Sequence, residues 1–123
     1  MVTEQKSTVE TERYVSGLML ELGIPAHLRG YYYLREAVLL SASDMELVGS
    51  VTKLLYPVIA RRYRTTLQRV ERAIRNAIEV SWERGNPEVF EDLFGFSRLT
   101  GSVRPTNSEY IARIADKVRM DGF

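Results

Sequence analysis

Basic side chains are concentrated in one short stretch of this sequence. Residues 53–75 hold 7 of the 17 basic residues and a single acid, Glu71, so the stretch carries 7 − 1 = +6. The rest of the chain has 10 basic and 15 acidic residues, or −5, so the net charge of +1 hides a strong separation of charge. A local positive field of this kind favours a polyanion such as DNA as a partner. The basic residues are Lys53, Arg61, Arg62, Arg64, Arg69, Arg72 and Arg75.

The second half of this stretch has the periodicity of an amphipathic helix over residues 67–84. One arc is apolar and holds Leu67, Val70, Ala73, Ile74, Ala77, Ile78 and Ser81. The other arc begins with Gln68, Arg69, Glu71, Arg72, Arg75 and Asn76. Arg, Gln and Asn form bidentate hydrogen bonds with guanine or adenine edges, each worth about 1–3 kcal/mol of discrimination, and Glu can accept from a cytosine amine. We therefore expect this arc to read bases in the major groove.

A shorter helix is expected just before this one, over about residues 54–63, with Arg61 and Arg62 near its end. Residues 65–68 fit a capping box, which would begin the longer helix after a short turn. This is helix-turn-helix geometry, in which the first helix crosses the DNA backbone and the second enters the groove. Secondary or phosphate contacts are expected from Arg62, Arg64, Thr65, Thr66, Gln68, Arg75 and Asn76.

The remaining sequence also has helical periodicity, so we predict an all-α fold, a compact bundle of about six helices that contains the helix-turn-helix. Residues 1–10 lack apolar periodicity and are expected to be a disordered lead or linker remnant, and residues 11–123 to be the helical domain. Helices are expected over about 11–22 and 28–42, from a capping box at 43–46 to Gly49, after the Asn-Pro pair at 86–87, and after a capping box at 106–109.

Side chains for catalysis or metal binding are scarce. There is no Cys, and His27 is the single histidine, so a zinc site or a Ser-His-Asp triad would depend on one residue. The carboxylates are scattered, and no Gly-rich loop could hold a phosphate. We therefore expect no enzyme activity, no catalytic residue, no metal site and no cofactor. No apolar run approaches the roughly 20 residues that span a bilayer, so we expect no membrane contact and a cytoplasmic location.

Five segments strongly resemble, in this order, one known family. They are IPAHLRGY at 24–31, YLREA at 33–37, RVERAIR at 69–75, LFG at 93–95 and PTNSE at 105–109. Together they resemble the C-terminal effector domain of the stage-zero sporulation response regulator A of endospore-forming bacteria, over about residues 15–119. The resemblance implies a helical domain that binds a short DNA box similar to TGTCGAA, often as two copies in tandem, and activates or represses transcription in sporulation.

The resemblance also implies roles for individual residues. Base reading is implied for three residues that the helical periodicity already places on the polar arc: Arg69, Glu71 and Arg72. A second surface, which contacts the sigma factor of RNA polymerase, is implied for Gly85, Phe94, Ala115 and Asp116.

Some residues depart from the family pattern. Arg64 stands where Asn is expected, and it adds a candidate phosphate contact. Val89, Glu91 and Arg98 stand where smaller or apolar residues are expected near the sigma-factor surface. The family normally begins with a phosphoacceptor receiver domain, a βαβ-alternating unit that nothing in this sequence can form, so we expect no receiver domain here.

Two other interpretations stay open at this point. The arginine-rich arc could be an ordinary solvated face whose charges pair with Glu71, Glu79 and Glu83. The chain could also be a stand-alone protein-interaction module that binds sigma factor or a full-length regulator without reading DNA. Its basic arc would then meet an acidic partner surface.

Overall fold

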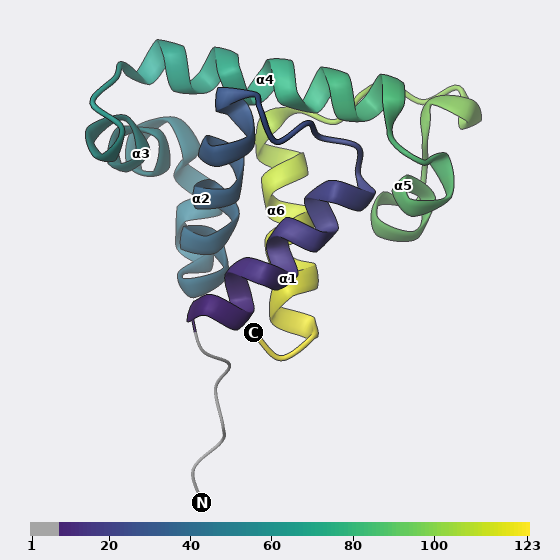
Figure 1. The fold of residues 1–123 in the computed structure, drawn as a ribbon, viewed down its shortest axis with the longest axis horizontal. Coiled ribbons are helices and arrows are strands. Elements are labelled where there is room, and N and C mark those ends of the chain that lie inside the picture. Colours follow the sequence, from purple (N-terminus) through teal and green to yellow (C-terminus); the bar gives the residue numbers. More distant parts are fainter. Residues whose placement is uncertain (1–7) are drawn as a thin grey trace, which may run out of the picture.

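The computed structural model describes residues 8–123, and every regular element in that part of the chain is helical (Figure 1). This confirms the predicted all-α bundle. The elements are α1 (Thr8–Glu21), α2 (Arg29–Ser43), the 3₁₀ helix η1 (Met45–Ser50), the π-helical η2 (Val51–Leu55), α3 (Tyr56–Arg62), α4 (Leu67–Arg84), α5 (Pro87–Phe94), the 3₁₀ helix η3 (Arg98–Thr100) and α6 (Asn107–Met120). Over residues 8–123 there is no helix with the length and apolar character that a membrane span requires.

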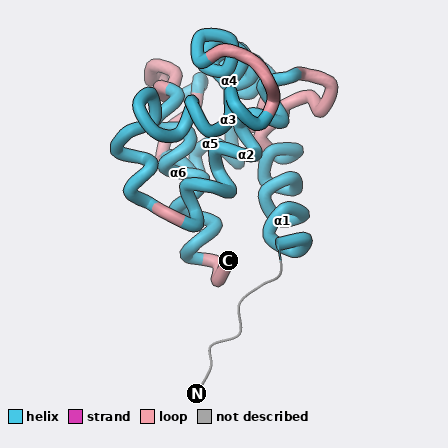
Figure 2. The backbone as a smooth tube through the Cα atoms, turned by 90° about the vertical axis from the view of Figure 1, so that its left-hand side faces the viewer, coloured by secondary structure: helices cyan, strands magenta, loops and turns pink. Residues whose placement is uncertain are grey.

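The helix α2 is the centre of the bundle and packs against α1, α4 and α6. The helix α4 runs across one end of α2 and α6, with α3 near its beginning and α5 near its end (Figures 1 and 2). It therefore forms one edge of the molecule, and one long side of α4 faces away from the other helices.

Apolar side chains from all six α-helices form the core. One buried hydroxyl links three of these helices, because Ser81 Oγ donates to the Leu22 carbonyl at 2.7 Å and lies 2.7 Å from Tyr110 Oη. The helix α4 is thus fixed to the end of α1 and to α6. Four positions of its predicted apolar arc are fully buried, Val70, Ile74, Ala77 and Ile78, and two others, Leu67 and Ala73, are partly buried against the core.

Several helix ends follow the local signals in the sequence. Asn86 caps α5 through its side chain, and Thr106 and Glu109 form the predicted capping box of α6. Gly85 ends α4 as predicted. A Cβ at Gly85 would lie 2.5 Å from two backbone oxygens, so the close approach between the ends of α1 and α4 requires glycine at this position.

Two predicted caps are off by one residue. Ser43 is the last residue of α2, so the following segment is capped by Asp44, which accepts from the Glu46 amide at 3.1 Å. Thr66 caps α4 in place of Thr65. In both cases, Ser43 with Asp44 and Thr65 with Thr66, two neighbouring polar residues fit the capping motif. The residue at which the preceding element ends decides which of the two is the cap.

Two predicted boundaries also differ. The helix α1 begins at Thr8, so the last three residues of the expected lead are helical, and residues 1–7 lie outside the described part of the chain. The helix expected over 54–63 begins within the π-helical η2, and α3 itself is shorter than predicted. Pro57 lies in the first turn of α3, which continues directly from the π-helical η2.

Candidate nucleic-acid interface

A tight turn between α3 and α4 exposes basic side chains and sets the start of α4. The Thr65 amide donates to the Ala60 carbonyl at 2.9 Å, which closes the turn on α3. The Thr66 side chain then accepts from the Arg69 amide at 3.2 Å. Arg64 lies between the two helices with φ of +51°, the one left-handed non-glycine residue among those that the structure describes. The two helices and their four-residue turn are consistent with the predicted helix-turn-helix.

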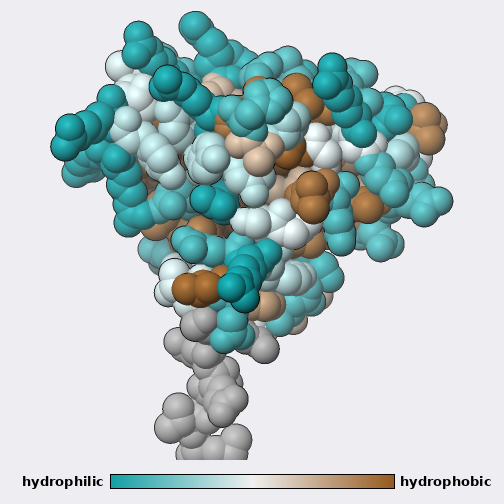
Figure 3. Space-filling model, in the orientation of Figure 1, coloured by the Kyte–Doolittle hydropathy of each residue, from teal (hydrophilic) through white to brown (hydrophobic). Residues whose placement is uncertain are grey.

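The side of α4 opposite the core carries the predicted polar residues, and hydrophilic side chains project from this edge of the molecule (Figure 3). Five of these residues are exposed: Gln68, Arg69, Arg72, Arg75 and Asn76. Among residues 8–123, Arg69 and Arg72 take part in no ion pair. Their guanidinium groups, on adjacent turns of a firmly packed helix, are therefore available to a ligand.

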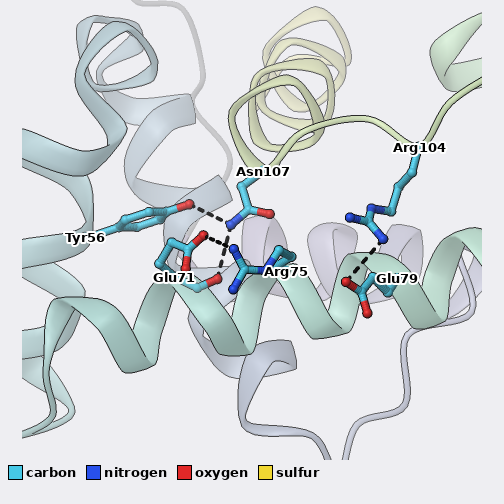
Figure 4. Close-up of polar contacts among 6 residues, drawn as sticks. All are labelled: Tyr56, Glu71, Arg75, Glu79, Arg104 and Asn107. Atoms are coloured by element: carbon cyan, nitrogen blue, oxygen red, sulfur yellow. Dashed lines mark hydrogen bonds and ion pairs between the residues drawn. The ribbon is translucent and has the colours of Figure 1, made fainter.

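Another part of α4 has the charge pairing expected of an ordinary solvated face. Arg75 Nη1 lies 2.8 Å from Glu71 Oε1, one turn earlier on the helix (Figure 4). Glu79 pairs with Arg104 at 3.2 Å and not with Arg75. Both ion pairs are partly exposed and lie on the flank of α4 that faces the segment leading into α6 (Figure 4). The Glu71 carboxylate is thus already engaged by a neighbouring arginine.

Close backbone contacts fix the two flanks of α4. On one flank, a Cβ added to Gly30 of α2 would lie 2.1 Å from the Ala73 carbonyl oxygen. On the other flank, Asn107 Nδ2 donates to Tyr56 Oη at 3.0 Å and to the Glu71 carbonyl at 3.2 Å (Figure 4). Burial raises the pKa of Tyr56, and the hydrogen bond from Asn107 opposes part of that rise, so the phenol stays protonated near neutral pH.

Sequence analysis missed both Tyr56 and Asn107 as parts of this site. Their contacts join residues 51 and 36 positions apart, so they leave no local pattern in the sequence. Asn107 was recognisable only as a member of the capping motif at the start of α6.

The other predicted DNA-contacting residues lie around the turn. They differ in how exposed they are and in whether another residue already binds them. Arg62 pairs with Glu36 of α2, although 56% of the Arg62 side chain is exposed. Arg64 is exposed and belongs to no ion pair within the described residues. The Thr65 side chain is half-buried, and the Thr66 hydroxyl is engaged as the cap of α4 but can still donate.

The residues implied for the sigma-factor surface are mostly inside the molecule. Gly85 and Ala115 are buried, Phe94 is 7% exposed, and Asp116 is the exposed member of the set. Asp116 and Arg113, both on α6, line two adjoining hollows beside α5. A partner can reach Asp116 directly, whereas the other three residues can influence this surface only through packing. Arg113 was not singled out from the sequence, because one exposed arginine on a helix carries no signal of its own.

One known family matches most of the chain. The model of the family described as the C-terminal domain of the sporulation initiation factor Spo0A matches residues 15–118, which is most of the chain. The match extends from α1 to the last turns of α6, so it includes the exposed face of α4, both of its flanking contacts and the Asp116 surface. The chain therefore belongs to the family of Spo0A C-terminal domains, which act as DNA-binding domains in the regulation of sporulation.

Proposed function

We propose that this domain recognises a short box similar to TGTCGAA in double-stranded DNA by placing α4 in the major groove. The observation that carries the proposal is the pair of guanidinium groups on Arg69 and Arg72, which form no ion pair within residues 8–123 and are exposed on a helix whose opposite face packs into the core. A guanidinium can form two parallel hydrogen bonds with guanine, and the helix supplies the rigid support that such bonds require.

The neighbouring side chains take supporting roles. Glu71 is engaged by Arg75 at 2.8 Å, which favours a role in orienting that arginine over a direct contact with cytosine. Gln68 and Asn76, both exposed, flank the arginines on α4 and can reach bases or phosphates. The candidate phosphate contacts of the turn are Arg62, Arg64, Thr65 and Thr66. Partial exposure lets Arg62 exchange Glu36 for a phosphate, and Arg64 has no ion-pair partner among the described residues to give up.

A second contact, with the sigma factor of RNA polymerase, is assigned to the surface around Asp116 and Arg113. Gly85, Phe94 and Ala115 would shape that surface from below. Two domains bound side by side on tandem boxes would form a homodimer on DNA, in the cytoplasm and without a cofactor. Asp116 is exposed beside two hollows, which is what supports this second contact.

The substitution Arg72→Lys tests base reading. Lysine keeps the charge but loses the planar fork, so preference for the TGTCGAA duplex over a scrambled duplex should fall by about 1–3 kcal/mol while affinity for the scrambled duplex is unchanged. Arg84→Lys is the matched control, because it makes the same change at the far end of α4. Fluorescence-anisotropy titrations of both duplexes measure the two affinities. If both variants kept the full preference, Arg72 would not read a base.

The substitution Arg62→Ala tests the phosphate contacts. It should weaken binding to both duplexes by the same factor and reduce the slope of log K against log salt by about one. Strong binding of the wild-type domain to sigma factor, together with equal affinity for both duplexes, would instead favour the protein-interaction module.

A further inference from the structure

Asn107, the first residue of α6, connects α6 to the helix-turn-helix. Its amide nitrogen donates to Tyr56 at the start of α3 and to the backbone of Glu71 on α4 (Figure 4). One side chain thus joins three helices through two hydrogen bonds of 3.0 and 3.2 Å. Tyr56 is 2% exposed, and Asn107 is the hydrogen-bond partner that the structure gives its hydroxyl.

The contact with Glu71 limits how α4 can rotate. Helical spacing places Glu71 about 100° to one side of Arg72 and Ala73 about 100° to the other side. Ala73 is held by the close approach of Gly30, and Glu71 is held by Asn107. Rotation of α4 about its axis would break one contact or compress the other.

Base reading is sensitive to that rotation. At the outer radius of a helix, roughly 5–6 Å, a rotation of about 10° moves an atom by about 1 Å. Binding groups must be held within about 0.5 Å and 10–20° of the productive geometry. Phosphate contacts tolerate more movement, because long side chains on the surface can follow the DNA backbone.

We propose that Asn107 is a positioning residue for DNA recognition, which sets the rotation of α4 so that Arg69 and Arg72 meet the base edges together. This inference rests on the proposed function. It assigns to a residue on α6, outside the helix-turn-helix, control over sequence preference without a contact to DNA.

The substitution Asn107→Asp separates this role from stability. Aspartate is favourable in the first turn of a helix, and its carboxylate can accept from the Tyr56 hydroxyl, so the fold should be kept. It cannot donate to the Glu71 carbonyl, so the link to α4 is lost. Ser108→Asp is the control for charge, because it adds the same charge one residue later on the exposed surface. The probes are a TGTCGAA duplex and a scrambled duplex, titrated by fluorescence anisotropy with each variant of the 123-residue chain.

We expect Asn107→Asp to reduce the ratio of the two affinities by about tenfold, the effect of one lost hydrogen bond at about 1.4 kcal/mol, whereas Ser108→Asp leaves the ratio unchanged. A second pair compares Asn107→Ala with Thr106→Ala, which weakens the same helix start through its cap without touching α4. Of this pair, only Asn107→Ala should lower the ratio.

Three results would overturn the proposal. An unchanged ratio in both Asn107 variants would show that the rotation of α4 does not depend on this residue. An equal fall in Thr106→Ala would show that loss of stability alone explains the effect. A wild-type domain with no preference between the two duplexes would refute the proposed function, and this inference with it.

Discussion

The packing of α2 on α4 makes Gly30→Ala strongly unfavourable. A Cβ at this position would lie 2.1 Å from the Ala73 carbonyl oxygen, and ordinary contact begins at 3.4 Å, so the helices would have to separate by 3.4 − 2.1 = 1.3 Å. The three atoms that the added Cβ meets are the Ala73 carbonyl oxygen and carbon and the Ala77 Cβ, so no side-chain rotation relieves the clash. Overpacking of this kind costs about 1–3 kcal/mol or more. We therefore expect the free energy of unfolding to fall by at least about 1–3 kcal/mol.

The same substitution at Gly17 is the matched control. Gly17 lies inside α1, is exposed, and has nothing within 4 Å of an added Cβ. Gly17→Ala should raise the free energy of unfolding by about 0.5–1 kcal/mol, because alanine loses less backbone freedom in a helix. Urea unfolding followed by circular dichroism measures both changes. A Gly30→Ala variant as stable as the wild type, beside a stabilised Gly17→Ala variant, would refute the close contact between α2 and α4.

Three further substitutions test other parts of the structure. Arg64→Asn should stabilise the fold by up to about 1 kcal/mol, because asparagine tolerates the left-handed backbone better, while it weakens binding to all duplexes alike; a loss of stability in urea unfolding would contradict this. Ser81→Ala should cost about 1–3 kcal/mol, because it leaves the buried Tyr110 hydroxyl without its partner; a shift of the urea midpoint within error of zero would count against that network. The hydrogen bond from Tyr14 lowers the pKa of Asp121. This hydrogen bond therefore stabilises the fold above the ordinary carboxyl pKa of about 4, and the stabilisation is lost as the pH falls below that value. Urea midpoints at pH 5 and pH 3 should therefore differ less in Asp121→Asn than in the wild type, and an equal difference would argue against this contact.

The fold could be predicted because most of its signals are local. The apolar period of residues 67–84 placed the buried side of α4 correctly, and the Asn-Pro pair at 86–87 and the capping box at 106–109 marked two helix starts. Where two neighbouring residues fit the same capping signal, the sequence did not show which of them is the cap. Ser43 and Asp44 both suit a cap, and the end of α2 selects Asp44. The length of a preceding helix depends on tertiary packing, which no short motif contains.

The site was predicted only as far as helical periodicity reaches. The exposure of Arg69 and Arg72 follows from the spacing of the apolar residues on α4. The roles of Asn107 and Tyr56 depend on how α6 meets α4, so the sequence alone could not indicate them. Ala115 shows a different limit, because the resemblance implied it for the sigma-factor surface and the structure buries it completely.

The most direct test of DNA reading by α4 is the ratio of two dissociation constants of the wild-type domain at one salt concentration, for a TGTCGAA duplex and for a scrambled duplex. Two bidentate contacts, from Arg69 and Arg72, supply at least about 2 kcal/mol of discrimination, so the first duplex should bind at least about 30-fold more tightly. Equal affinities with equal salt dependence would mean that the domain binds only the phosphate backbone, and would contradict the account.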